Sequence, residues 1–212
     1  MSQTKHSPRQ QPQFELIAGN VCLDFINTLD DRSSGAPKEL LKGYGDLVRF
    51  GEQAGILTSR QANDLHHQIG QSPKDAGKAI NQARILREAL HDIFLALTSR
   101  KSVPQPAMQI LNDGLHDAFL HSHLVLHHNR CEWRFDELTT SFNGILWPIA
   151  RAAGDLLVSA DAALVGMCSS PTCQWFFLDT SKNHRRRWCD MKLCGNRAKA
   201  RRFYTKRQRA VG

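Results

Sequence analysis

Four cysteines near the C-terminus have the types and spacing for metal chemistry. They form two pairs, Cys168-x4-Cys173 and Cys189-x4-Cys194, separated by fifteen residues. Two close pairs joined by a loop can supply the four corners of a tetrahedral site, and thiolates are soft ligands that suit zinc. Because four thiolates leave no position open for water, we expect one structural Zn²⁺ per chain rather than a catalytic one.

The spacing alone leaves other uses of these cysteines open. Two disulfides could join the same four residues, and an iron–sulfur cluster shares the ligand set. The polar N-terminus lacks the apolar segment of a signal peptide, so we expect a cytoplasmic protein with reduced thiols. His184 could replace one ligand. Cys22 and Cys131 stand apart from the group, and we expect both to be small buried side chains.

The segment that holds the four cysteines also carries the positive charge of the chain. From Cys168 to Gly212 there are twelve Lys and Arg against two Asp and Glu, a net charge of +10, whereas the preceding residues sum to −2. This asymmetry points to a polyanion as the partner of the C-terminal segment only. Arginine favours bidentate contacts to phosphate and guanine. The expected nucleic-acid contacts are Arg185, Arg186, Arg187, Lys192, Asn196, Arg197, Lys199, Arg201, Arg202 and Lys206.

The elements around the cysteines are expected in the order of a treble-clef zinc finger. Residues 175–178 predict an apolar strand, 179–183 a turn, and 184–188 a strand that returns toward the metal. A basic helix then starts at the second cysteine pair, where Asn196 could cap it, and Ala200, Phe203 and Tyr204 are expected to pack inward. In so small a unit, zinc supplies most of the folding free energy, about 10–16 kcal/mol apparent.

The residues before the cysteines predict helices with one small hairpin. Apolar residues recur at helical spacing over 21–29, 44–54, 58–69, 73–97, 104–119 and 138–164, the last with Pro148 as a kink or break. Alternating residues around Asn129 and Arg130 predict a short β-hairpin. The expected fold is therefore mainly α: a helical bundle with one short β-hairpin, followed by a small treble-clef-like Cys₄ finger. We expect a disordered lead-in at 1–13, a helical domain at 14–165 and the finger at 166–212.

Several function classes find no support in the sequence. No run of about 18 apolar residues could span a membrane. A Gly-rich phosphate loop, a G-x-S-x-G elbow and an HExxH helix are all absent, so we expect no enzyme. Polar residues on apolar helices could instead line a ligand pocket, or make structural hydrogen bonds because buried polar groups need partners. The candidate pocket residues are Asp24, Asn27, Thr28, Arg32, Arg87 and Trp147.

Two strings in the chain resemble known families. RRWCDMKLCGNRAKARRFY closely resembles the CGNR zinc finger, named for Cys194, Gly195, Asn196 and Arg197, and VCLDFINTLDDR resembles the start of the ABATE domain. Together the resemblance covers about Gly19 to Arg209. It implies a bacterial, stress-responsive transcription regulator whose finger binds zinc and DNA and whose helical domain senses a small molecule or protein effector.

Two expectations about partners follow from the size and type of the finger. One finger offers a small interface with DNA, so a homodimer or a second contact from the body is expected. The alternative function is an RNA- or ribosome-associated zinc-binding protein, since treble-clef fingers also serve there. In that case the exposed aromatics Trp175, Trp188 and Tyr204 would stack on unpaired bases.

Overall fold

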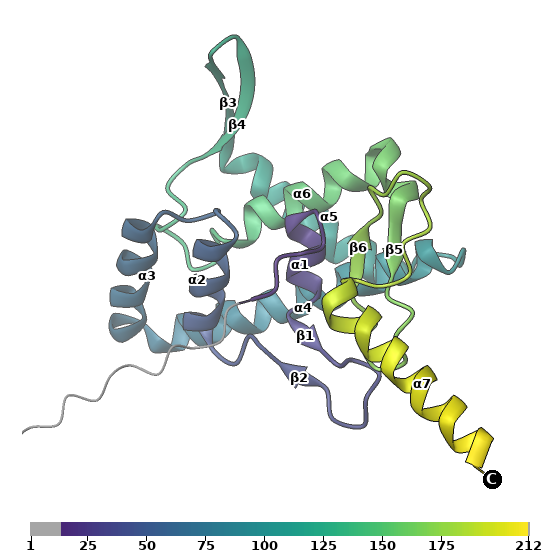
Figure 1. The fold of residues 1–212 in the computed structure, drawn as a ribbon. Helices are drawn as coiled ribbons and strands as arrows, with labels where there is room; N and C mark the ends of the chain where they lie inside the picture. Colours follow the sequence, from purple (N-terminus) through teal and green to yellow (C-terminus); the bar gives the residue numbers. More distant parts are fainter. Residues whose placement is uncertain (1–13, 212) are drawn as a thin grey trace, which may run out of the picture.

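The fold is a helical body from which a single basic helix projects. We describe it from a computed structural model, which places residues 14–211 and the side chains of residues 14–203. The predicted lead-in at 1–13 lies outside the described residues. Figure 1 shows the body helices gathered around α4, the β3–β4 hairpin extending at one end, and α7 running outward at the other.

Six α-helices build the body, and the helical spacing in the sequence predicts all of them. The longest, α4, contacts α1, α2, α3 and α5, so it forms the axis of the core. Its buried side chains recur every three or four residues, as in Ala83, Leu86, Leu90 and Phe94. The body helices are α1 (Val21–Ile26), α2 (Tyr44–Gln53), α3 (Ser59–Gln71), α4 (Pro73–Thr98), α5 (Gln105–Leu120) and α6 (Leu146–Val158).

Two antiparallel strand pairs belong to the body. β3 (Ser122–His127) pairs with β4 (Arg130–Phe135) as predicted, through His128 and Asn129, which both have positive φ as type I′ hairpin turns require. β1 (Leu29–Asp30) pairs with β2 (Lys38–Glu39). The sequence pattern predicts a helix that runs through Leu29, but α1 ends at Ile26 and Leu29 lies in β1. Strands of two residues are too short to show an alternating pattern.

The predicted helix over 138–164 is wrong in its first part. Residues 138–144 form turns, and α6 begins only at Leu146. Pro148 is therefore the third residue of the helix, where the backbone N–H has no acceptor within the helix, so it causes neither a kink nor a break. A 3₁₀-helix, η1 (Ala160–Leu164), follows α6.

The expectation for the two separate cysteines is right for one and wrong for the other. Cys22 is fully buried on α1. Cys131 is exposed, because it lies on the outward-extending β3–β4 hairpin opposite Leu126, which is itself exposed.

A two-stranded ribbon joins the body to the cysteine-bearing segment. β5 (Val165–Met167) pairs with β6 (Phe176–Leu178). Successive side chains of a strand face opposite ways. Phe176 accordingly packs into the body core near Phe94, while Phe177 packs among the four cysteines. The two parts thus share one ribbon, each using one of its faces.

The predicted returning strand at 184–188 is wrong. Both edges of β6 are already occupied, by β5 on one side and on the other by the body, where Leu178 N donates to Ala18 O. The backbone N–H groups of Ser181 and Arg186 donate instead to the carboxylate of Asp179. The chain therefore returns to the metal site as an irregular loop.

The last helix also differs from its prediction. A π-helical turn, η2 (Met191–Gly195), leads directly into α7 (Asn196–Val211). Asp190 caps this turn, since its carboxylate accepts from the N–H groups of Lys192 and Leu193, and Asn196 is already helical. The predicted inward packing of Phe203 is wrong, because α7 leaves the molecule and this side chain is 63% exposed. Tyr204 has its side chain outside the described residues.

Candidate metal centre and nucleic-acid interface

The four cysteines converge on one buried point. Their sulfur atoms all lie within 4.8 Å of one another, and those of Cys173 and Cys189 are 3.7 Å apart. A tetrahedron with Zn–S bonds of about 2.3 Å has edges of about 3.8 Å, so the sulfur positions fit a zinc ion. Two disulfides would need sulfur atoms about 2 Å apart, and the structure records all four cysteines as free.

The pKa values of the cysteine thiols also favour a bound cation at this point. Hydrogen bonds from Cys173 and Cys189 lower the pKa of Cys168, whereas the interaction with Cys168 raises the pKa values of Cys173 and Cys189. One thiolate at this point therefore prevents its neighbours from ionising. A divalent cation would remove that conflict, because each thiolate would then face positive charge. Zinc would be held by all four thiolates and would act structurally, by folding the loop around itself.

Main-chain hydrogen bonds position the two cysteine pairs. Cys168 N donates to Trp175 O, and Cys194 N donates to Asp190 O. Arg186 ties the returning loop to this framework, since its guanidinium lies 4.4 Å from the centre of the Phe177 ring and donates to the carbonyls of Trp188 and Cys189. The sequence predicts Arg186 as a nucleic-acid contact. In the structure its side chain is half-buried and forms hydrogen bonds with the backbone of the finger itself.

The other described candidates for nucleic-acid binding lie on the surface. Their side chains are exposed on the returning loop, on η2 and along α7, which points away from the body (Figure 1). The structure therefore gathers them at one end of the molecule. They are Arg185, Arg187, Lys192, Asn196, Arg197, Lys199, Arg201 and Arg202. The side chain of Lys206, the tenth candidate, lies outside the described residues.

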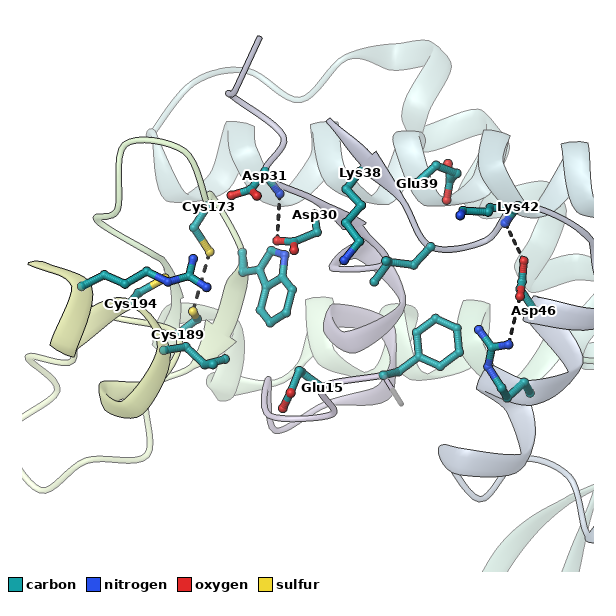
Figure 2. A pocket seen from close by; sticks show the side chains of 16 residues that line it. Glu15, Asp30, Asp31, Lys38, Glu39, Lys42, Asp46, Cys173, Cys189 and Cys194 are labelled. Carbon is teal, nitrogen blue, oxygen red and sulfur yellow. Dashed lines mark hydrogen bonds and ion pairs between the residues drawn. The ribbon is translucent and has the colours of Figure 1, made fainter. Parts of the chain in front are cut away.

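A cleft of about 580 Å³ lies between the finger and the body, and no pattern in the sequence predicts it. Phe14, Lys38 and Arg49 line it from the body, and Trp175 and Arg197 from the finger. Figure 2 shows three of the cysteines at one end of the cleft and Asp46 at the other. Its residues come from five separate segments, so no local spacing could reveal it.

Comparison with known families agrees with this architecture. Residues 19–160 match the ABATE family, described as "Putative stress-induced transcription regulator", and residues 165–207 match the CGNR zinc finger. The chain belongs to the ABATE family. Its four cysteines are those of the CGNR finger, which holds one structural zinc ion. No curated protein matches the chain.

The polar residues of the ABATE domain that were candidates for a pocket hold the protein together instead. Asn27 is buried, and its side-chain amide makes two hydrogen bonds of 2.9 Å with the backbone of Phe176, one donated and one accepted. This amide replaces a strand partner for β6 and fastens the finger to the ABATE domain. Asp24 accepts from Ala18 N, and burial raises the pKa of its carboxyl to about 6.

The charged candidates of the ABATE domain form one ion-pair network. Arg87 is only 3% exposed and makes two hydrogen bonds of 2.7 Å to Glu39, with further ones to Thr28 and Glu88. Arg32 pairs with the other side of Glu88. Burial opposes ionisation of Glu88, yet the hydrogen bonds and charges of Arg32 and Arg87 hold its pKa below the usual range.

The remaining candidate, Trp147, lies apart from this network. It lines a smaller cavity of about 210 Å³ between α4, α5 and α6, and stacks on His121 with 3.9 Å between ring centres. The other five candidates are not among the residues that line either cavity. The structure therefore does not bring the six side chains around one ligand site.

Proposed function

We propose that this protein is a DNA-binding transcription regulator of the cytoplasm rather than an enzyme. The observation that carries the proposal is α7, a helix with exposed cations that projects from a zinc-organised base. Its 16 residues make a rod of about 24 Å, and the major groove of DNA is wide enough to admit such a helix. No helix in the described part of the chain is long and apolar enough to cross a membrane.

The placement of the cations on α7 supports a position inside a groove. Arg197 and Arg201 are four residues apart and share one side of the helix, whereas Lys199 and Arg202 lie on the opposite side. A helix in the major groove has a phosphate backbone on each side. Two rows of cations on opposite sides match that arrangement, and leave base contacts to the residues between them.

The RNA-binding alternative has less support. It requires exposed aromatic side chains on which unpaired bases can stack. Trp175 is 7% exposed and lies in the finger core, and Trp188 is only partly exposed beside it. Phe203, an exposed aromatic ring of the described finger, lies on the projecting helix α7 itself.

Selection of bound sequences from random duplex DNA, with the zinc-loaded full chain at a fixed salt concentration, tests the proposal. We expect an enriched motif, and two half-sites in it if two copies bind together. A protein that contacts about six phosphates has a log–log salt slope near −5. Replacing Lys199 and Arg202 by Ala should make that slope shallower by about 2. The same change at Lys74 and Lys101, exposed cations of the body, should leave it unchanged.

Two results would count against a DNA-binding role. One is a selection that enriches no duplex sequence. The other is tighter binding of single-stranded RNA than of any selected duplex in direct competition.

A further inference from the structure

We propose that the cleft between the ABATE domain and the finger binds a small organic acid with an apolar body. This inference deepens the proposed function, because it names the class of effector and the place where the effector acts. The volume of about 580 Å³ lies in the range of small-molecule sites. One end of the cleft is the metal site, which zinc fills. The remainder lies between β1, β2 and α2 on one side and Trp175, Leu193 and Arg197 on the other.

Two buried hydrogen-bond donors in the lining lack an acceptor. The indole Nε1 of Trp175 has no partner in the described part of the chain, although the side chain is 7% exposed. The Nε of Arg49 is likewise buried without a partner. Arg49 cannot easily turn away, since it pairs with Asp46 and lies over the Phe14 ring. Buried donors in proteins are almost always paired, so these two point to a ligand that supplies acceptors.

The charges and apolar side chains of the lining narrow the class of ligand. The lining holds five carboxylates and four cations, so its net charge does not select an anion. Three of the cations, Lys38, Lys42 and Arg197, have no ion-pair partner in the described part of the chain and are therefore available to pair with a single carboxylate. Figure 2 shows the side chain of Lys38 extending into the middle of the cleft. Phe14, Leu40, Trp175 and Leu193 supply apolar contacts. Glu15, Asp30 and Asp31 are in the same lining and would repel a polyphosphate.

These features together fit a monoanion. Its carboxylate would accept from the Trp175 indole and pair with Lys38, and its apolar body would lie against the Phe14 ring. Because the ligand would touch both Lys38 of β2 and Trp175 of the finger, it would bridge the two domains.

Calorimetric titration of the zinc-loaded full chain with 2-naphthoate tests this inference, with 2-naphthylmethylamine as the cation of matching shape. We expect saturable binding of the acid and at least tenfold weaker binding of the amine. Trp175→Phe should weaken binding of the acid about tenfold, because it removes one hydrogen bond to a charged group. Trp133→Phe, the same change on the β3–β4 hairpin, should leave the affinity unchanged.

A second pair of variants, outside the finger, controls for the case in which Trp175→Phe weakens binding only by unfolding the finger. Lys38→Ala should weaken binding of the acid about fivefold, and Lys74→Ala on α4 should leave that binding unchanged. The inference is overturned by no saturable binding of the acid, by an amine that binds as tightly, or by equal effects of the cleft and control variants. DNA binding is measured on the same preparations. A protein that binds DNA but not the acid keeps the proposed function and loses only this site.

Discussion

At the scale of single residues, the polar side chains of the ABATE domain act through specific partners. Asn27 shows this most clearly, since its amide is held between the N–H and the carbonyl of Phe176, 149 residues away. Its two hydrogen bonds are buried, so no water can replace them. We infer that Asn27 sets the position of the finger on the body.

We predict that Asn27→Ala destabilises the junction strongly. The variant leaves a buried N–H and a buried carbonyl of Phe176 without partners, which together cost about 2–4 kcal/mol. The measurement is the free energy of unfolding in urea. Asn63→Ala on the exposed side of α3 serves as the control and should change it by less than about 0.5 kcal/mol. Similar values for the two variants would show that Asn27 does not hold the junction.

Asp24 provides a prediction of pH dependence. Burial raises the pKa of its carboxyl to about 6 in the folded protein, above its ordinary value of 3.8. Between these two values the unfolded chain releases the proton and the folded chain keeps it. The contribution of Asp24 to stability therefore falls as the pH rises from about 4 to 6.

Asp24→Asn should remove this loss of stability with rising pH, and its side-chain oxygen should still accept from Ala18 N. We expect the variant to be more stable than the parent at pH 7, by an amount of the order of 1 kcal/mol because the carboxyl is partly exposed. The difference between variant and parent in urea unfolding at pH 5 and pH 7 checks this. Zinc binding also varies with pH, but it cancels in that difference. A difference that does not grow with pH would contradict the raised pKa.

The sequence indicates which residues can bind a metal or form hydrogen bonds, but it does not indicate which residues they contact. The spacing of the four cysteines predicts that they share one metal, and the sulfur positions in the structure then argue against two disulfides. Asn27 and Thr28 stand out among apolar residues, and structural hydrogen bonding is the interpretation that the pattern favours. The sequence alone does not indicate that Asn27 meets Phe176 or that Arg87 meets Glu39, because those contacts arise only when distant segments pack.

At the scale of elements, the finger depends on its metal while the body has its own core. The finger core consists of the four cysteines with Trp175 and Phe177, flanked by a few partly buried side chains. The body core spans all six of its helices and also takes in Phe176. The two units should therefore respond differently to loss of zinc.

We predict that removal of zinc by a chelator unfolds the finger and leaves the body helices in place. A structural site contributes about 10–16 kcal/mol apparent, which the small finger core cannot replace. Helical circular dichroism should fall only by the share of α7, while the fluorescence of Trp175 and Trp188 should change toward that of exposed indole. Cys189→Ser should reproduce this effect. Cys131→Ser, at the exposed cysteine outside the site, should bind zinc as the parent does. A cooperative loss of all helical signal would contradict the independence of the body.

The elements differ in how well local patterns predict them. Long helices such as α4 repeat their apolar spacing over many turns and are predicted correctly. The strand expected at 184–188 fails because pairing depends on which edges of β6 remain open, and Ala18 and Asn27 already cover one. The inward packing expected of Phe203 fails because helical spacing says which residues share a face, and not whether anything lies against that face.

At the scale of the whole molecule, the β5–β6 ribbon and the adjoining cleft connect the ABATE domain to the finger. The ribbon fixes one side of the finger through Phe176, and the cleft leaves the other side unfilled. Arg197 lines the cleft and is also a candidate DNA contact at the start of α7. A ligand in the cleft and DNA on α7 would therefore act on the same guanidinium.

We predict that an acid bound in the cleft weakens binding of the selected DNA. Its negative charge in the cleft that Arg197 lines competes with phosphate for that guanidinium, and coupling between two sites in proteins is at least about fivefold in typical cases. Titration of labelled DNA with and without saturating 2-naphthoate measures the effect, at one salt concentration. Linkage requires that bound DNA weaken binding of the acid by the same factor, and calorimetric titration of the protein–DNA complex with the acid checks this. Arg197→Ala should lower DNA affinity and abolish the coupling. Lys199→Ala should also lower DNA affinity but leave the coupling unchanged. Equal DNA affinity with and without bound acid would show that the cleft does not communicate with α7.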